Sequence, residues 1–382
     1  MRYLLFLFLY HYSRKIEGMV MGKVIGFSDS LTLTILMFCG EFFGGLAVII
    51  YQKYFFSHKR KKKKINMGIE LIQGNSQIYS KGNNFKILLL IFFAAFFDFS
   101  QFIISCSIPE IAILSPTSDQ RLCIIMTITS SLLCTFALKI KTGRHQIFSL
   151  RGMGICCFII FIIEVIYKSK GVIFGKFLSA YFLVICRLSF ISFIDVIEKY
   201  LAEYNNANKF IVLSAEGFFG IILCVIYSLL INKNPIESID KVYGELSLGK
   251  KIMLVIFLIL YFVLSAGINI YKIICNIIYT PMVKSLPAYL LNPLFIIYYF
   301  IYQNDFTIGG EKNYFYFIIN IILSIIIDFF AFIYNEFIIL NCFGLQKDTH
   351  REISQRAFQN YSLSEMEEID KIEHENDFSF TF

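Results

Sequence analysis

The sequence has no tryptophan and only six prolines, and charged residues make up just 16% of its 382 positions. A soluble domain carries about 25% charged and about 45–50% apolar residues. Here the apolar share is 57% and the mean hydropathy is +0.66. These values exclude a soluble enzyme, a disordered chain, collagen and a disulfide-rich secreted scaffold. They predict an all-α, polytopic membrane protein.

Sequence motifs for catalysis and metal binding are also missing. The chain has no HExxH, no P-loop, no GxSxG in a suitable context and no CxxC. Its ten cysteines fall inside or at the ends of apolar blocks, where packing explains them. The five histidines lie outside the clear blocks, which argues against a buried histidine metal site or proton relay. We therefore expect no enzyme activity, no cofactor and no metal.

The apolar residues form blocks of about 20, the length that crosses a bilayer as a helix. We predict nine clear spans. They cover about Leu31–Tyr51, Ile87–Ser107, Leu122–Leu138, Gly152–Tyr167, Phe177–Ile197, Phe210–Ile231, Ile252–Ile270, Leu286–Tyr302 and Tyr314–Leu340.

The ends of the chain differ from this middle part. Residues 1–30 hold one weak apolar run, Tyr3–Tyr10, which is too short to cross hydrocarbon about 30 Å thick. Residues 31–340 form the predicted transmembrane domain. Residues 341–382 form a predicted tail with an acidic, solvated end.

Charge indicates orientation. Lys53–Lys86 holds nine Lys/Arg and one acid, whereas Gly344–Phe382 holds four Lys/Arg and nine acids. The positive-inside rule places the basic connection in the cytosol. Alternation then also places Lys139–Arg151, Glu198–Lys209, Tyr271–Lys284 and the tail there. The basic run is interpreted as a stop-transfer flank with some attraction to anionic lipid, not as a nucleic-acid surface.

Ionisable residues inside the spans are costly and usually face a bundle interior or a water-filled cavity. Asp195 and Glu336 lie near predicted boundaries, so water can reach them there. The set comprises Glu41, Asp98, Glu164, Arg187, Asp195, Glu216, Asp328 and Glu336, with Arg121 at a span entrance.

Glu41 lies between Gly40 and Gly44, a GxxxG spacing that lets another helix approach closely. Two interpretations of Glu41 stay open at this point. It is either a gating or proton site beside that close contact, or a carboxyl paired with a neighbouring helix for assembly.

Asp98 and Arg187 lie in the middle of their spans. Asp98 is expected to line a cavity. Arg187 needs a partner such as Glu164, Asp98 or Glu216. Binding of a substrate anion and a structural ion pair both remain open for it.

The order of short motifs along the chain resembles the drug/metabolite transporter superfamily. Within it, the chain is most similar to the nucleotide-sugar-transporter-like solute carrier 35 group, F branch. The motifs are Phe38–Phe42, Ala94–Ser100, Gln120–Arg121, Lys139–Gln146, Glu198–Tyr200, Ala215–Gly220, Val283–Leu286 and Tyr334–Glu336.

This resemblance implies a ten-helix fold of two inverted five-helix repeats, with a boundary near residues 168–176 and a substrate cavity between the repeats. It implies a secondary transporter or exchanger of a small, anionic, nucleotide-sugar-like metabolite in an endomembrane such as Golgi, ER or lysosome. The partners would be the lipid bilayer and the substrate, with a homodimer and cytosolic partners of the tail as options. Arg121, Arg187 and Lys284 would attract the anion, while Glu41, Asp98 and Glu216 would gate or couple transport.

Three departures from the family pattern support an alternative. The first helix is eroded, Leu122 stands where a glycine is expected, and Tyr289–Pro293 carries none of the charges found in relatives. The alternative is a non-transporting membrane scaffold or regulator that keeps the transporter fold.

Overall fold

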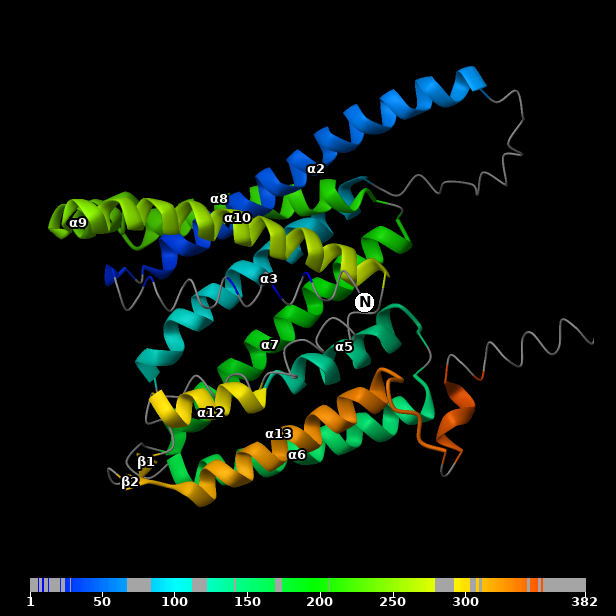
Figure 1. Cartoon of the computed structure of the whole chain (residues 1–382), viewed down its shortest axis with the longest axis vertical. Coiled ribbons are helices and arrows are strands. Elements are labelled where there is room, and N and C mark those ends of the chain that lie inside the picture. The colour runs from blue at the N-terminus through cyan, green and yellow to red at the C-terminus, as the bar shows by residue number, and fades with distance from the viewer. Residues whose placement is uncertain are drawn as a thin grey trace, which may run out of the picture.

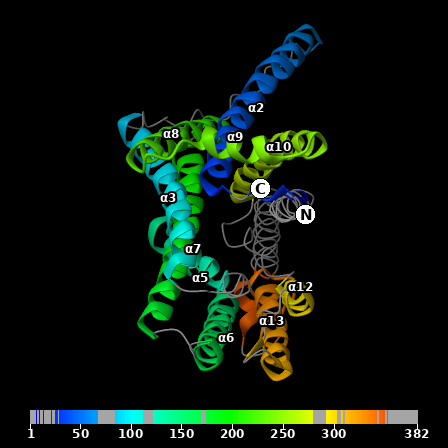
Figure 2. The same cartoon turned by 90° about the vertical axis from the view of Figure 1, so that its left-hand side faces the viewer.

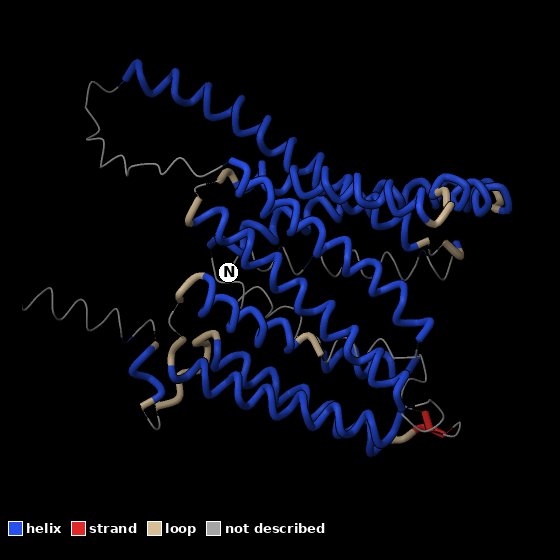
Figure 3. The backbone as a smooth tube through the Cα atoms, turned by 180° about the vertical axis from the view of Figure 1, so that it is seen from behind, coloured by secondary structure: helices blue, strands red, loops and turns tan. Residues whose placement is uncertain are grey.

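The described part of the chain is almost wholly helical in the computed structural model (Figure 3). A short antiparallel hairpin pairs β1 (Thr307–Ile308) with β2 (Glu311–Lys312). The structure describes residues 6, 9, 13, 21, 25–27, 29–66, 84–111, 122–140, 142–168, 174–205, 207–278, 292–302, 307–308, 311–341, 344–349 and 352.

Within these described ranges, seven helices are long and apolar enough to cross a membrane. The architecture is therefore consistent with an integral multi-pass membrane protein. The seven are α2 (Ser30–Asn66), α3 (Asn84–Ile111), α6 (Arg144–Lys168), α7 (Phe174–Glu203), α8 (Lys209–Leu230), α10 (Leu248–Ile278) and α13 (Tyr314–Tyr334).

Three shorter helices complete the bundle, along with a 3-10 turn, η2 (Leu345–Asp348). The predicted span at Leu122–Leu138 contains α5 (Ile124–Ala137), whose 14 residues extend only about 21 Å. In the predicted span at Leu286–Tyr302, α12 (Asn292–Tyr302) is described. The predicted link Asn232–Lys251 contains α9 (Pro235–Glu245), which starts where the Asn234 side chain accepts a bond from the Ile236 amide.

The helices lie in layers (Figure 1, Figure 2). One layer contains α2, α8, α9 and α10, the opposite one contains α6, α12 and α13, and α3, α5 and α7 lie between them. The main packing partners are α2 with α8 and α10, α3 with α7 and α8, α5 with α7, and α6 with α13.

Packed residues give the helix directions. Gly45 of α2 lies against Phe210 of α8, and Phe38 lies against Gly220, so α2 and α8 are antiparallel. Phe148 packs on Phe330, and Tyr167 stacks on Tyr316, so α6 and α13 are antiparallel too.

Helices extend into three of the predicted connections. α2 continues through the basic run to Asn66 and projects from the bundle (Figure 1), α7 continues to Glu203, and α10 continues to Ile278. The sequence predicts loops for these charged segments because charged side chains cannot face lipid. Along α7 and α10 they are instead buried between helices, where they pair with one another.

The start of α2 is fixed by a cap that also joins it to the chain after α8. Asp29 Oδ2 accepts a bond from the Thr32 amide at 3.0 Å, and Asp29 Oδ1 lies 2.6 Å from Lys233 Nζ. Burial raises the pKa of Asp29, but the bonds from Lys233 and Thr32 outweigh it and hold the pKa below its ordinary value.

Candidate functional site

A cluster of paired charges fills the contact between the C-terminal halves of α7 and α10. Lys272 Nζ lies 3.3 Å from Glu198 Oε1 and 3.9 Å from Asp195 Oδ1. Both carboxylates are buried, and the Lys272 side chain is 16% exposed. We call Asp195, Glu198, Lys199, Lys272 and Asn276 the α7–α10 ionic cluster.

Hydrogen bonds compensate part of the cost of burying these charges. Asn276 Nδ2 donates to Glu198 Oε2 at 2.9 Å and to the Asp195 carbonyl at 2.6 Å. Lys199 Nζ donates to the Asn276 carbonyl at 3.3 Å and pairs with Glu203 at 2.9 Å. Buried ion pairs are tolerated when such additional bonds satisfy them.

Helix periodicity explains why the residues of the cluster lie on the facing sides of α7 and α10. Asp195, Glu198, Lys199 and Glu203 recur at three- and four-residue spacings, so they share one face of α7. On α10 the same spacing produces a buried polar stripe. It consists of Ser265, Asn269, Lys272 and Asn276.

The α2–α8 crossing adds two buried carboxylates, Glu41 and Glu216. A Cβ added to Gly217 would lie 2.5 Å from the Phe42 amide nitrogen and 3.0 Å from the Glu41 Cβ. The helices therefore meet here almost backbone to backbone.

The two glycines of the GxxxG spacing face another helix. A Cβ on Gly40 would lie 2.9 Å from the Phe262 carbonyl, and one on Gly44 would lie 3.1 Å from Ala266 Cβ. Both neighbours belong to α10, so α2 is held between α8 and α10.

The two groups of charges influence each other. Glu198 acts most strongly on the Lys272 ammonium, followed by Asp195, Asp98 and Glu216. Glu41 of α2 acts in turn on Glu216, so charges on α2, α3, α7, α8 and α10 influence one another.

Some buried polar atoms at this site lack a hydrogen-bond partner within the described part of the chain. They are Glu216 Oε1, Ser265 Oγ, Asn269 Nδ2 and Asn276 Oδ1. A buried polar atom without a bond is costly, so each of these atoms calls for a physical explanation.

The other predicted residues lie in several places. Asp98 accepts a bond from Gln101 Nε2 at 3.2 Å, and Arg187 Nη1 donates to Ser105 Oγ at 3.2 Å. Glu164 is fully buried and accepts a bond from the Tyr181 hydroxyl. Arg121 and Lys284 lie outside the described residues.

Sequence reasoning missed most of the α7–α10 ionic cluster. Asp195 was expected near water but is only 2% exposed. Glu198, Lys199 and Lys272 were assigned to cytosolic connections. The signal that could have found them is their helical spacing, which continues beyond the apolar runs.

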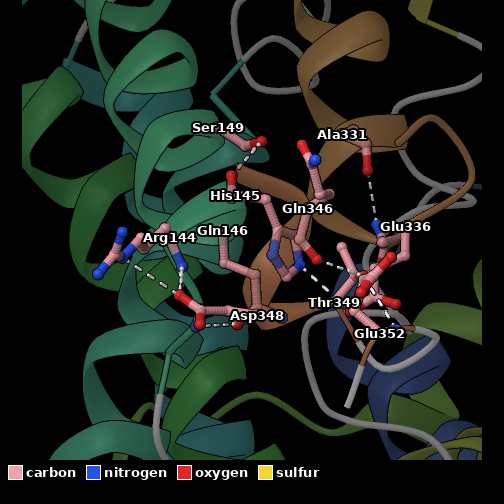
Figure 4. A network of polar contacts seen from close by, with 12 residues as sticks. Arg144, His145, Gln146, Ser149, Ala331, Glu336, Gln346, Asp348, Thr349 and Glu352 are labelled. Carbon is pink, nitrogen blue, oxygen red and sulfur yellow. Dashed lines mark hydrogen bonds and ion pairs between the residues drawn. The ribbon is translucent and has the colours of Figure 1, made fainter. Parts of the chain in front are cut away.

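A second polar network joins the first turn of α6 to the segment after α13 (Figure 4). Asp348 Oδ2 accepts a bond from the Arg144 amide at 3.2 Å and lies 3.5 Å from Arg144 Nε. His145 is buried, with its Nε2 3.3 Å from Glu336 Oε1. Burial of a histidine was not expected from the sequence.

An apolar groove of about 840 Å³ lies between α5, α6 and α7. Its lining includes Ile125, Gly154, Phe158 and Phe182. Among the residues that the structure describes, no group of three or more His, Cys, Asp or Glu could hold a metal ion.

Comparisons with known proteins add no family. No protein-family model matches the chain, and a comparison with curated protein sequences finds no significant match.

Proposed function

We propose that the chain is a secondary transporter of a small organic metabolite that works by alternating access. The observation that carries this proposal is a group of charged side chains from five helices: Glu41, Asp195, Glu198 and Glu216 are buried, and Asp98 and Lys272 are half-buried. Within membrane-spanning helices, such residues usually mark substrate or ion pathways.

The pattern of helix packing supports two inverted repeats. Let α2 correspond to α8, α3 to α10, α5 to α12 and α6 to α13. With these assignments, the α3–α8 contact corresponds to the α10–α2 contact, the α5–α6 contact to the α12–α13 contact, and the α2–α3 contact to the α8–α10 contact. All six contacts occur, and the self-corresponding pairs α2–α8 and α6–α13 pack extensively.

Helix direction agrees with this correspondence. Self-corresponding helices of an inverted repeat must be antiparallel, as α2–α8 and α6–α13 are. In the α10–α2 contact, Gly40 meets Phe262 and Gly44 meets Ala266, so the helices are parallel. In α3–α8, Ile91 groups with Val212 and Phe99 packs on Tyr227, which is also parallel. The repeat boundary near 168–176 falls at the end of α6 and the start of α7.

Each charged residue then has a proposed role. Glu41 and Glu216 lie where the two repeats cross, so relative motion of the repeats would change their surroundings. Asp98 and Lys272 extend the site across both repeats. Arg187, together with Arg121 and Lys284, is proposed to attract an anion of the nucleotide-sugar-like class. The endomembrane location and the cytosolic C-terminus are part of the same proposal.

A thermal-shift screen of the purified protein tests this function with nucleotides, nucleotide sugars and small organic acids. A ligand at 100 times its dissociation constant stabilises the folded state by about 2.7 kcal/mol. A shift confined to one chemical class, followed by uptake into liposomes that is lost in Asp98→Asn, would support transport. Folded protein with neither a shift nor uptake would favour the scaffold.

A further inference from the structure

Ionisable side chains form a series from one end of the bundle to its interior. Glu203 is the last residue of α7, and Glu198 with Lys272 lies about one to two turns deeper. Glu216 follows at about 10 Å from the start of α8. Glu41 lies beside it, and Asp98, whose charge reaches Cys224, lies deeper still.

Glu216 differs from its neighbours because one of its two carboxylate oxygens has no hydrogen-bond partner among the residues that the structure describes. Glu198 has an ammonium and an amide within 3.3 Å, and Asp98 accepts a bond from Gln101. Glu216 is 5% exposed, and its Oε1 has no hydrogen-bond partner within the described part of the chain.

Charges on four neighbouring helices act on Glu216. They are Glu198 of α7, Lys272 of α10, Glu41 of α2 and Asp98 of α3. Three of these four charges are carboxylates, and the one ammonium already pairs with Glu198. Full ionisation of like charges in a low-dielectric interior is costly, and one proton removes that cost.

We infer that Glu216 is a reversible proton-binding site, reached from the membrane face where α7 ends and α8 begins. A proton needs only one carboxylate oxygen, whereas a metal ion needs several converging ligands. The role of this proton rests on the proposed function: if the chain is a transporter, the proton bound at Glu216 is its coupling ion.

Infrared pH titration of the purified full-length protein in lipid nanodiscs tests the site without any substrate. We expect a protonated-carboxyl band that disappears as pH rises and is absent in Glu216→Gln. Glu164→Gln is the matched control, because Glu164 is equally buried but bonded to Tyr181 outside this series. Glu216→Asp should retain a titrating band, which separates loss of the proton site from misfolding. A pH-dependent spectrum in Glu216→Gln identical to the wild type would overturn the inference.

Proteoliposomes separate this inference from the proposed function. With radiolabelled nucleotides as probes, an imposed pH gradient should drive uptake in the wild type, and this response to the gradient should be lost in Glu216→Gln. Wild-type exchange that ignores the gradient would overturn proton coupling and leave transport intact. Protonation of Glu216 with no exchange of any probe would overturn transport alone.

Discussion

Removal of the Lys272 ammonium should destabilise the fold more than loss of a surface ion pair. In Lys272→Met the apolar length of the side chain is kept, but the buried carboxylates of Glu198 and Asp195 lose the ammonium that lies 3.3 Å and 3.9 Å from them. Breaking a buried pair by deleting one partner costs about 3–5 kcal/mol, because the remaining charge is uncompensated. An exposed pair contributes about 0–1 kcal/mol.

The assay is the free energy of unfolding in mixed micelles, measured by denaturant titration. The double variant Lys272→Met/Glu198→Gln removes both charges, and it should recover more than half of the loss while leaving the bond from Asn276 possible. The control is Lys250→Met, which removes an exposed lysine at the other end of α10. A loss of less than about 1 kcal/mol in Lys272→Met would refute the reasoning.

Three further predictions concern other contacts. Gly217→Ala should lower the free energy of unfolding by about 1–3 kcal/mol, because the new Cβ would lie 2.5–2.7 Å from the α2 backbone. The control Gly154→Ala has open space around it and should be neutral or stabilising by up to about 1 kcal/mol. Equal effects of the two variants in unfolding titrations would contradict the close α2–α8 contact. Asp29→Asn should cost stability at about pH 6, and this cost should shrink as pH falls below the ordinary carboxyl pKa of 3.8. A carboxylate with a depressed pKa stabilises the fold above its ordinary pKa and loses that effect as pH falls through the folded-state value; a pH-independent difference would exclude the ion pair and cap as its cause. Asp348→Ala should destabilise the start of α6 by about 1 kcal/mol and speed proteolysis after α13. Asp348→Asn should have a smaller effect on both, since an amide oxygen can still accept the bond from the Arg144 amide. Identical cleavage rates in the two variants would count against the cap.

The helical class and most spans could be predicted from the sequence, because block length and apolar content decide both. The ends of α7 and α10 could not. A hydropathy argument treats Glu198 and Lys272 as solvent-exposed, yet Glu198 is buried and Lys272 is half-buried, and their charges pair at 3.3 Å. Which residues pair over such a distance in sequence depends on how α7 and α10 pack, and a local sequence pattern does not predict that packing. The start of α9 could have been predicted, since Asn234-Pro235 is an N-terminal helix signal.

The candidate site was predicted in part. Glu41 and Glu216 were identified because a carboxylate in an apolar run has few structural explanations. Ser265 and Asn269 were not, because small polar residues are common in membrane helices. Their significance comes from sharing one buried face of α10 with Lys272.

The position of α2 between α8 and α10 has a consequence for biosynthesis. Gly40 meets its neighbours on α10 only after roughly 220 more residues have been made. At about 5–20 residues per second this takes tens of seconds. During that interval Gly40 and Gly44 of α2 lack the α10 neighbours against which they pack in the folded protein. A chain stalled before α10 should therefore be a substrate for membrane quality control, whereas one released after α13 should not.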